Sequence, residues 1–333
     1  MLIKKMIKNK KILIIGFGSI GQRHWRNLLN LGYKNIYVYD TDESRIKNYE
    51  LPACKASLRA DRRIKNINVN NLKQFNVVFV CNPNNMHIKT ALLAAKAGCH
   101  LFIEKPLSHN LKNLDKLRRI CRQKKVIAMV ACNMRFHPCL AFIKKYLSKG
   151  KLGKVYSISH EFGYYLPYWR PGQDYRKNYA ARKEMGGGII LDDIHEFDLL
   201  FWLNNFAKIK EAKFIYNKTS DLKINTEDNC IATFEFNNKV LGLVKCDYLQ
   251  QVYSRHCKIV GENGNLEWDF NENIVWLQRR GSRQKLFTKA KYNLNTMYIE
   301  ELKYFFNCLA KKQKTFNDIE IASRVLKYCL ERK

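Results

Sequence analysis

The 333-residue sequence has few prolines, few acidic residues and no apolar run long enough to span a membrane. Only 6 prolines occur, and we find no Gly/Ser-rich linker, low-complexity tract or fixed-period repeat, which excludes a repeat architecture. No segment reaches the roughly 18–20 apolar residues of a transmembrane helix. With 46% hydrophobic and 27% charged residues, the composition is that of a globular protein long enough for two domains.

The cysteines lack the spacing of a metal site or a disulfide framework. There are 11, an odd number without any C-x-x-C pair, and several lie in apolar runs, such as Cys81, Cys99 and Cys132. This pattern is typical of small buried side chains in a reducing cytosol, and we predict no metal site. The apolar run Ile12–Ile15 is too short for a signal peptide, and glycines follow it at once. The sequence therefore predicts a cytoplasmic protein with no membrane partner.

Acidic residues are outnumbered two to one, with 29 Asp+Glu against 60 Lys+Arg and a formal net charge of +31. Such an excess can indicate a nucleic acid, an anionic membrane surface or an anionic substrate. The lysines are spread along the whole chain, which is also rich in Asn and Ile, so we attribute the excess to an A/T-rich genome. No nucleic-acid-binding signature accompanies the charge, and we predict no nucleic-acid partner. An anionic substrate, such as a nucleotide-linked sugar, is compatible with it.

A glycine-rich turn lies between a predicted strand and a predicted helix. The apolar, β-branched run Ile12–Ile15 is typical of a central strand in a parallel sheet, and a helical pattern follows over residues 22–31. The first glycine of a G-x-G-x-x-G turn permits the tight bend, the second lets the backbone approach a pyrophosphate, and the third lets the helix pack closely. Phosphates then sit at the helix N-terminus. We predict that six residues bind a dinucleotide here: Gly16, Phe17, Gly18, Ser19, Ile20 and Gly21.

A carboxylate follows this turn at the distance that dinucleotide binding requires. Asp40 ends the second predicted strand, residues 35–40, and lies 40 − 21 = 19 positions after Gly21. There it can accept hydrogen bonds from the adenosine ribose, or it can be a plain strand-end turn residue. Its charge would repel a 2′-phosphate and so favours NAD. Arg45 lies nearby, and its positive charge could reduce the preference for NAD, so NADP is the alternative cofactor.

Strands and helices alternate through the first 132 residues. Further strands are predicted at 76–81, 100–103 and 126–131, with helices at 88–97 and 111–123. This order predicts a doubly wound parallel sheet, in which ligands bind at the carboxyl ends of the strands. Polar residues at those ends are predicted to bind the cofactor, with His87 either shaping the nicotinamide end or capping a helix: Asn82, Pro83, His87, Glu104 and Lys105.

The second half shows a different pattern, from residue 133 to residue 333. Predicted strands cover residues 155–165, 208–216, 229–236, 239–248, 255–260 and 265–270, and turn residues at 237–238 and 261–264 connect hairpins. This predicts an α+β domain with a large, mostly antiparallel open sheet. Two final helices, at 295–310 and 318–330, are predicted to pack back on the N-terminal domain.

At Glu104-Lys105-Pro106 the chain begins to resemble the glucose–fructose oxidoreductase / inositol dehydrogenase (Gfo/Idh/MocA) family. The resemblance continues through residues 133–138, the G-x-L-G-x-V of residues 150–155, and the G-G-G-x-x-x-D-x-x-H of residues 186–195. It covers nearly the whole chain, and the motifs stand in the family's order. It implies an N-terminal Rossmann domain, a nicotinamide cofactor, and homo-oligomerisation, as a dimer or tetramer, through the C-terminal sheet. Residues 166–182 resemble a branch associated with nucleotide-sugar pathways.

The resemblance also implies catalytic residues. Hydride transfer from a secondary alcohol needs a group that takes the hydroxyl proton and a positive environment for the developing alkoxide. Lys105 and His195 are the candidates, with Asp192 three residues before His195 on the same face of a predicted helix that opens at Gly188. The commoner family spacing is D-x-x-x-H, whereas this chain has D-x-x-H, which changes the helical angle between Asp192 and His195.

Aromatic and basic residues are predicted to form the substrate pocket, because aromatic rings stack on sugars and arginines hold phosphates or carboxylates. These are Arg135, Trp169, Arg170, Tyr175 and Tyr179. The predicted function is hydride transfer between NAD(P) and a secondary alcohol of a sugar or nucleotide-sugar derivative. Two alternatives stay open: elimination or glycoside cleavage assisted by transient oxidation with tightly held NAD, and a non-catalytic NAD(H)-binding regulator.

Overall fold

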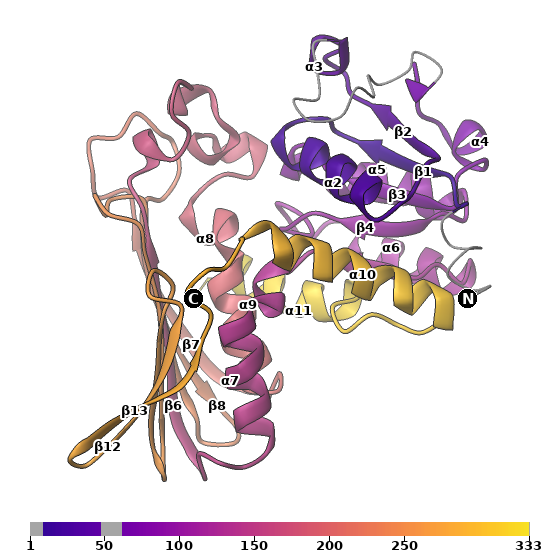
Figure 1. Cartoon of the computed structure of the whole chain (residues 1–333). Coiled ribbons are helices and arrows are strands. Elements are labelled where there is room, and N and C mark those ends of the chain that lie inside the picture. The colour runs from indigo at the N-terminus through magenta and orange to yellow at the C-terminus, as the bar shows by residue number, and fades with distance from the viewer. Residues whose placement is uncertain (1–8, 48–61, 333) are drawn as a thin grey trace. The chain divides into compact units, whose positions relative to one another are not determined.

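The computed structural model describes residues 9–47 and 62–332. It divides the chain into two compact units (Figure 1). The first unit contains Met1–Ala131 and Tyr298–Arg324, and the second contains Cys132–Met297 and Val325–Lys333. The start of the segment considered as a signal peptide, residues 1–8, lies outside the described residues. The part of the chain that the structure describes contains no helix with the length and apolar composition needed to cross a bilayer.

The first unit is built on a five-stranded parallel sheet with the strand order β2-β1-β3-β4-β5. Its strands are β1 (Ile12–Ile15), β2 (Ile36–Tyr39), β3 (Val77–Val80), β4 (His100–Ile103) and β5 (Ala128–Val130). Every residue of β1 and β3 is buried, as expected for strands covered on both faces. Because all five strands run in the same direction, their carboxyl ends meet at one edge of the sheet.

Helices connect these strands. They are α2 (Ser19–Asn30), α3 (Ser44–Lys47), α4 (Val69–Leu72), α5 (His87–Lys96) and α6 (Leu114–Gln123), with a short 3₁₀ turn at Asn84–Met86. The long α10 (Asn295–Lys311) shares a face of the sheet with α2, since His24 of α2 and Phe305 of α10 both contact the ring of Phe102. Beyond α10, Asn317 bonds through its side chain and its carbonyl oxygen to Val130 at the edge of β5. These contacts explain why Tyr298–Arg324 belongs to the first unit.

The second unit contains an eight-stranded sheet with the order β13-β12-β11-β10-β6-β9-β8-β7. Its strands are β6 (Val155–Gly163), β7 (Ile209–Asn217), β8 (Asn229–Phe236), β9 (Leu241–Asp247), β10 (Ser254–Gly261), β11 (Gly264–Asp269), β12 (Ile274–Arg279) and β13 (Ser282–Thr288). All neighbouring pairs are antiparallel except β6 and β9. The mostly antiparallel open sheet that the sequence predicted is therefore confirmed.

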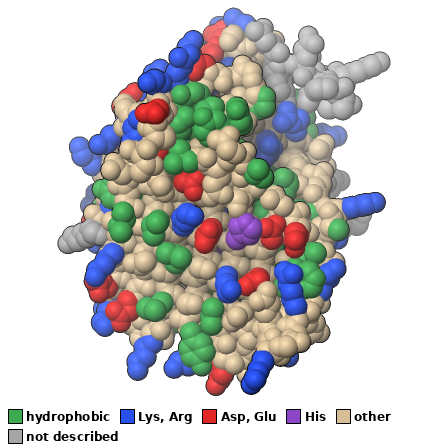
Figure 2. Space-filling view, turned by 90° about the vertical axis from the view of Figure 1, so that its left-hand side faces the viewer, with side chains coloured by type: hydrophobic (Ala, Val, Ile, Leu, Met, Phe, Trp, Pro, Cys, Tyr) green, Lys and Arg blue, Asp and Glu red, His purple; other side chains and the backbone are tan. Residues whose placement is uncertain are grey.

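Helices cover one face of this second sheet and leave the other face open (Figures 1 and 2). They are α7 (Pro138–Ser148), α8 (Ile189–Asp192) and α9 (Ile194–Leu203), and the chain ends in α11 (Ile319–Leu330). Almost every residue of α9 is buried, because it packs on β6 and β9. Helix α7 and the strands β12 and β13 were missed by the sequence analysis.

A buried histidine at the start of α7 predicts loss of stability in acid. His137 is completely buried and packs against three rings: Trp268, Phe270 and Tyr292. Burial lowers the pKa of His137 from 6.5 to about 4. The unfolded chain takes up this proton near its ordinary pKa, so the free energy of unfolding falls as the pH drops from about 6.5 to 4.

We expect the contribution of His137 to the free energy of unfolding, measured with urea, to be about 2–3 kcal/mol smaller at pH 4.5 than at pH 7. The His137→Leu variant should lose that part of the pH dependence. If the wild type and the variant have parallel stability profiles between pH 7 and pH 4.5, the imidazole is not the cause.

Candidate functional site

The glycine turn after β1 brings backbone segments into direct contact. Gly16 has φ +94°, and a Cβ on it would lie 2.4 Å from the backbone nitrogen of Asn82. A Cβ on Gly21 would lie 2.0 Å from the carbonyl oxygen of Gly16. Both positions therefore exclude any side chain. Gly18 differs, because the atom nearest to a Cβ on it would be in the Arg45 guanidinium, 3.8 Å away.

The start of α2 has the properties of an anion site. The helix begins at Ser19 behind Gly18, its first turn holds no acidic residue, and no side chain of the described residues caps it. N–H groups at an uncapped helix start attract negatively charged oxygens. Together with the side-chain-free surface at Gly18, they fit the pyrophosphate of a dinucleotide.

Asp40 makes hydrogen bonds within the protein, as the alternative prediction of a strand-end turn residue implies. Its Oδ2 accepts the backbone N–H of Phe17 at 2.6 Å, and its Oδ1 accepts the backbone N–H of Asp42 at 2.9 Å. The carboxylate thus ties the glycine turn to the end of β2. Each oxygen has a further lone pair that a ribose hydroxyl can use. Arg45 approaches the same carboxylate, with Nη1 3.8 Å from Oδ2, and its side chain is half exposed.

His87 connects two of the strand-end loops. This residue begins α5 and is buried, with Nε2 2.7 Å from the carbonyl oxygen of Asn82 and Nδ1 2.7 Å from that of Pro106. Burial lowers the pKa of the imidazole and outweighs the opposing effect of the two carbonyl groups. The side chain of Asn82 donates to Thr90 in the same helix at 2.8 Å, while Pro83 is exposed. His87 therefore fixes the shape of the loops after β3 and β4.

Glu104 and Lys105 follow β4 directly. Glu104 is buried and lies 2.6 Å from Nε2 of His24, a residue of α2 that the sequence analysis did not single out. Burial raises the pKa of Glu104, but His24 and neighbouring positive charges outweigh it, and the net pKa is lowered. Lys105 is half-buried, and the Lys105–Pro106 peptide bond is cis. The first unit thus gathers the glycine turn, Asp40 and Lys105 at the carboxyl edge of one sheet.

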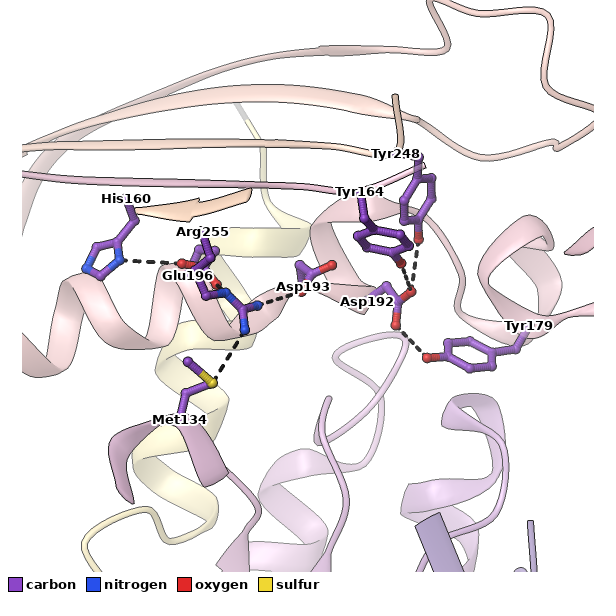
Figure 3. A network of polar contacts seen from close by, with 9 residues as sticks. All are labelled: Met134, His160, Tyr164, Tyr179, Asp192, Asp193, Glu196, Tyr248 and Arg255. Carbon is purple, nitrogen blue, oxygen red and sulfur yellow. Dashed lines mark hydrogen bonds and ion pairs between the residues drawn. The ribbon is translucent and has the colours of Figure 1, made fainter. Parts of the chain in front are cut away.

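In the second unit, Asp192 lies among three tyrosines (Figure 3). Its Oδ2 accepts hydrogen bonds from Tyr164 at 3.0 Å and Tyr248 at 3.2 Å, and its Oδ1 accepts one from Tyr179 at 2.5 Å. The carboxylate is only 5% exposed. Burial and the neighbouring carboxylate raise the pKa of both Tyr164 and Tyr248 well above 10, so both phenols stay protonated donors. Two residues that the sequence proposed for different roles, Asp192 and Tyr179, therefore form one hydrogen-bonded group.

His195 lies in the first turn of α9 and is 9% exposed. The sequence placed Asp192 and His195 on one face of a single helix, and this geometry is wrong. Helix α8 ends at Asp192, α9 begins at Ile194, and Asp193 between them has the non-helical angles φ −108° and ψ 38°. Tertiary contacts of the carboxylates on both sides of the break override the continuous helical pattern.

The predicted substrate residues have diverse environments. Trp169 is 44% exposed and packs against Tyr164, with ring centroids 4.3 Å apart. The guanidinium of Arg170 lies 6.0 Å from the ring of Tyr179. The hydroxyl of Tyr175 accepts the backbone N–H of Lys223. Arg135 is buried and bonds to both carboxylate oxygens of Asp198, at 2.8 and 2.5 Å, so its charge has a partner within the protein.

The sequence analysis missed several residues of this second cluster. Tyr164 follows β6 and Tyr248 follows β9, and these strands are parallel neighbours in the sheet. The sequence shows a tyrosine directly after each of these two strands, but it does not show that the two strands are neighbours in the sheet. Arg255, which pairs with Asp193 and Glu196, was missed for the same reason. Lys105 belongs to the first unit, and Asp192 and His195 belong to the second.

Comparison with known proteins supports this description. Residues 10–132 match the model of an oxidoreductase family with an NAD-binding Rossmann fold, and residues 140–267 match the GFO/IDH/MocA C-terminal domain. Myo-inositol 2-dehydrogenase of Thermotoga maritima is 28% identical over 89% of this chain and 86% of that protein. The scyllo-inositol 2-dehydrogenase (NAD(+)) of Bacillus subtilis is 22% identical over 89% of this chain and 85% of that protein.

Solved structures share the fold along almost the whole length. The solved structure of levoglucosan dehydrogenase in complex with NADH and levoglucosan has a TM-score of 0.81 at 16% identity, covering 96% of this chain and 95% of that chain. UDP-N-acetylglucosamine 3-dehydrogenase of Acidithiobacillus ferrooxidans has a TM-score of 0.77 at 19% identity, covering 97% and 96%. With both family models matched in order, the chain belongs to the Gfo/Idh/MocA family and is an NAD-binding oxidoreductase.

Proposed function

We propose that this protein is an NAD-dependent dehydrogenase that oxidises a secondary alcohol of a sugar, polyol or nucleotide-sugar derivative, or reduces the corresponding ketone. The observation that carries the proposal is the edge of the first sheet. There the side-chain-free surface at Gly18 and the uncapped start of α2 follow β1, and Lys105 follows β4. The relatives support the substrate class, because their names include two inositol dehydrogenases.

Each residue has a proposed part in the reaction. Bound NAD supplies the hydride acceptor, C4 of its nicotinamide ring. The ammonium group of Lys105 stabilises the alkoxide as the hydroxyl proton leaves, and His195 exchanges that proton. Asp192 accepts three phenolic hydrogen bonds, which hold its side chain in a fixed position near the start of α9. Trp169, Arg170 and Tyr179 contact the substrate.

The first experiment is a substrate panel. Purified protein is incubated with NAD or NADP and a set of inositols, sugars and nucleotide sugars, and with NADH or NADPH and the corresponding keto compounds. The absorbance of the reduced nicotinamide is followed. Turnover with one compound establishes the dehydrogenase. Product formation from a glycoside without net change in NADH would instead establish the elimination chemistry, and cofactor binding without turnover of any kind would favour a regulator.

Cofactor preference depends on Asp40. We expect Asp40→Ser to lower the preference for NAD over NADP by a factor of about 10–100, because it removes the charge that repels a 2′-phosphate while Arg45 remains beside it. The variant should also bind NAD more weakly, since the ties to Phe17 and Asp42 are lost. Dissociation constants for both cofactors, measured by fluorescence titration, test this. A ratio unchanged from the wild type would remove Asp40 from cofactor selection.

The open face of the second sheet supports a homo-oligomer, either a dimer or a tetramer. This face combines exposed apolar side chains with charges already paired across strands (Figure 2). Ile215 is 77% exposed and Leu241 57%, while Lys258 pairs with Glu267 at 2.9 Å and His256 with Asp269 at 2.8 Å. Pairing lowers the desolvation cost of covering these charges, and the exposed apolar side chains would supply the driving force for association. Light scattering should give the mass of two or four chains, and a monomer would contradict the proposal.

We further propose that the enzyme works in the reducing cytoplasm. The ten cysteines among the described residues are all buried free thiols.

A further inference from the structure

One buried arginine contacts both carboxylates that flank His195. Arg255, on β10, is 5% exposed. Its Nη2 donates a hydrogen bond to Oδ1 of Asp193 at 3.2 Å, and its Nε forms an ion pair with Oε1 of Glu196 at 2.9 Å (Figure 3). The guanidinium also lies 4.0 Å from the ring centroid of Phe162 on the neighbouring strand β6. A single planar group from the sheet therefore spans the turn of chain that contains His195.

That turn needs support from outside the helix. The break at Asp193 interrupts the backbone hydrogen bonds between α8 and α9, so the first turn of α9 lacks a continuous helix before it. Two carboxylates three residues apart, both buried, repel each other unless a cation lies between them. Arg255 provides that cation, since it donates a hydrogen bond to Asp193 and forms an ion pair with Glu196.

The surrounding groups balance the charge of this cluster. His160 is completely buried, with Nδ1 3.4 Å from Oε2 of Glu196 and Nε2 3.6 Å from Sγ of Cys257. Burial alone would lower the pKa of His160, but Cys257 and Glu196 outweigh it and raise the pKa to about 10. The cluster thus contains two carboxylates and two cations, and Arg255 contacts the carboxylates on both sides of His195.

We propose that Arg255 is a positioning residue for His195: by holding Asp193 and Glu196, it fixes the first turn of α9 and with it the direction of the imidazole. The inference rests on the proposed role of His195 in proton exchange. A strand residue that need not contact the substrate would in this way set the geometry of a catalytic side chain.

The test compares Arg255→Gln and Arg255→Lys with Lys144→Gln. Lys144 is a matched control, because it is a half-buried cation that supports the opposite end of α9, bonding to the carbonyl oxygen of Trp202 and to Asn205. We expect Arg255→Gln to lower kcat by a factor of 30 or more with less than a threefold change in KM. Arg255→Lys should recover part of the loss, and Lys144→Gln should keep kcat within about twofold.

A second readout does not depend on turnover. The titration of His195 is followed by NMR on ¹³C-histidine-labelled protein, with the signal assigned through His195→Gln. We expect the pKa of His195 to rise by at least 0.5 in Arg255→Gln, because a nearby cation is removed, and to stay within 0.2 in Lys144→Gln. Unchanged titration of His195 in both Arg255 variants, or equal losses of kcat in Arg255→Gln and Lys144→Gln at equal melting temperature, would overturn the proposal.

The two hypotheses can fail separately. If the wild type turns over no substrate of the panel, the proposed function fails while the titration still tests the positioning. If Arg255→Gln does not fold, Arg255→Lys carries the test alone, since it keeps the positive charge but cannot hold both carboxylates in the same way. A lysine variant with wild-type kcat and wild-type His195 titration would then contradict the proposal.

Discussion

Lys105→Met is expected to lower kcat by a factor of about 10³ while the dissociation constant for NAD changes less than threefold. Methionine keeps a long, flexible side chain but removes the ammonium group. The loss should therefore fall on stabilisation of the alkoxide rather than on the packing of the loop after β4. His87 and Glu104 keep their own partners, Pro106 and His24, so the strand ends should keep their shape.

The measurement combines steady-state turnover with the substrate found in the panel and fluorescence titration with NAD. Lys112→Met is the matched control, because Lys112 is an exposed lysine of the same unit, and its kcat should stay within twofold of the wild type. A Lys105→Met enzyme with more than a tenth of the wild-type kcat would exclude the lysine from catalysis. A large loss of NAD affinity would instead assign Lys105 to the cofactor.

The first unit was predictable because its signals are local. Strands β1 and β4 were predicted to the residue, since short apolar runs end at glycine or charged residues. The glycine turn and Asp40 lie within 30 residues of one another, and dinucleotide binding requires both a turn that accepts the pyrophosphate and a carboxylate near the ribose. What sequence could not show was that Asp40 also accepts the N–H of Phe17, because that contact depends on how the loop folds against β2.

The second unit was less predictable because its site depends on strand order. Tyr164, after β6, is far in the sequence from Tyr248, after β9, and from Arg255 on β10, and they come together because β6 lies between β10 and β9 in the sheet. The break at Asp193 has the same origin, since carboxylates bound by tertiary partners override a helical pattern. Strand β13 at the edge of the sheet was missed because most of its side chains are polar and exposed. Strand β12 carried a signal that was overlooked, since it opens with the apolar run Ile274–Leu277. Helix α7 carried a signal that was overlooked, with Pro138 at its first position and apolar residues at helical spacing.

Two alanine substitutions in the glycine turn, Gly18→Ala and Gly21→Ala, can distinguish an effect on cofactor binding from an effect on folding. In Gly21→Ala, the new Cβ would lie 2.0 Å from the carbonyl oxygen of Gly16, so α2 must move away from β1. In Gly18→Ala, the nearest described atom is 3.8 Å away, and φ is −70°, so the protein alone accommodates the methyl group. A pyrophosphate that approaches the backbone of Gly18 would meet that methyl group directly.

We therefore expect Gly18→Ala to weaken NAD binding by a factor of at least 100 with a melting temperature within about 2 °C of the wild type. Gly21→Ala should lose several kcal/mol of stability or fail to fold, since a backbone clash of this size cannot be relieved by rotating a side chain. Calorimetry and NAD titration on both variants distinguish the effects. If Gly18→Ala binds NAD normally, the pyrophosphate does not pass over this glycine, and the cofactor must be held by the neighbouring strand ends.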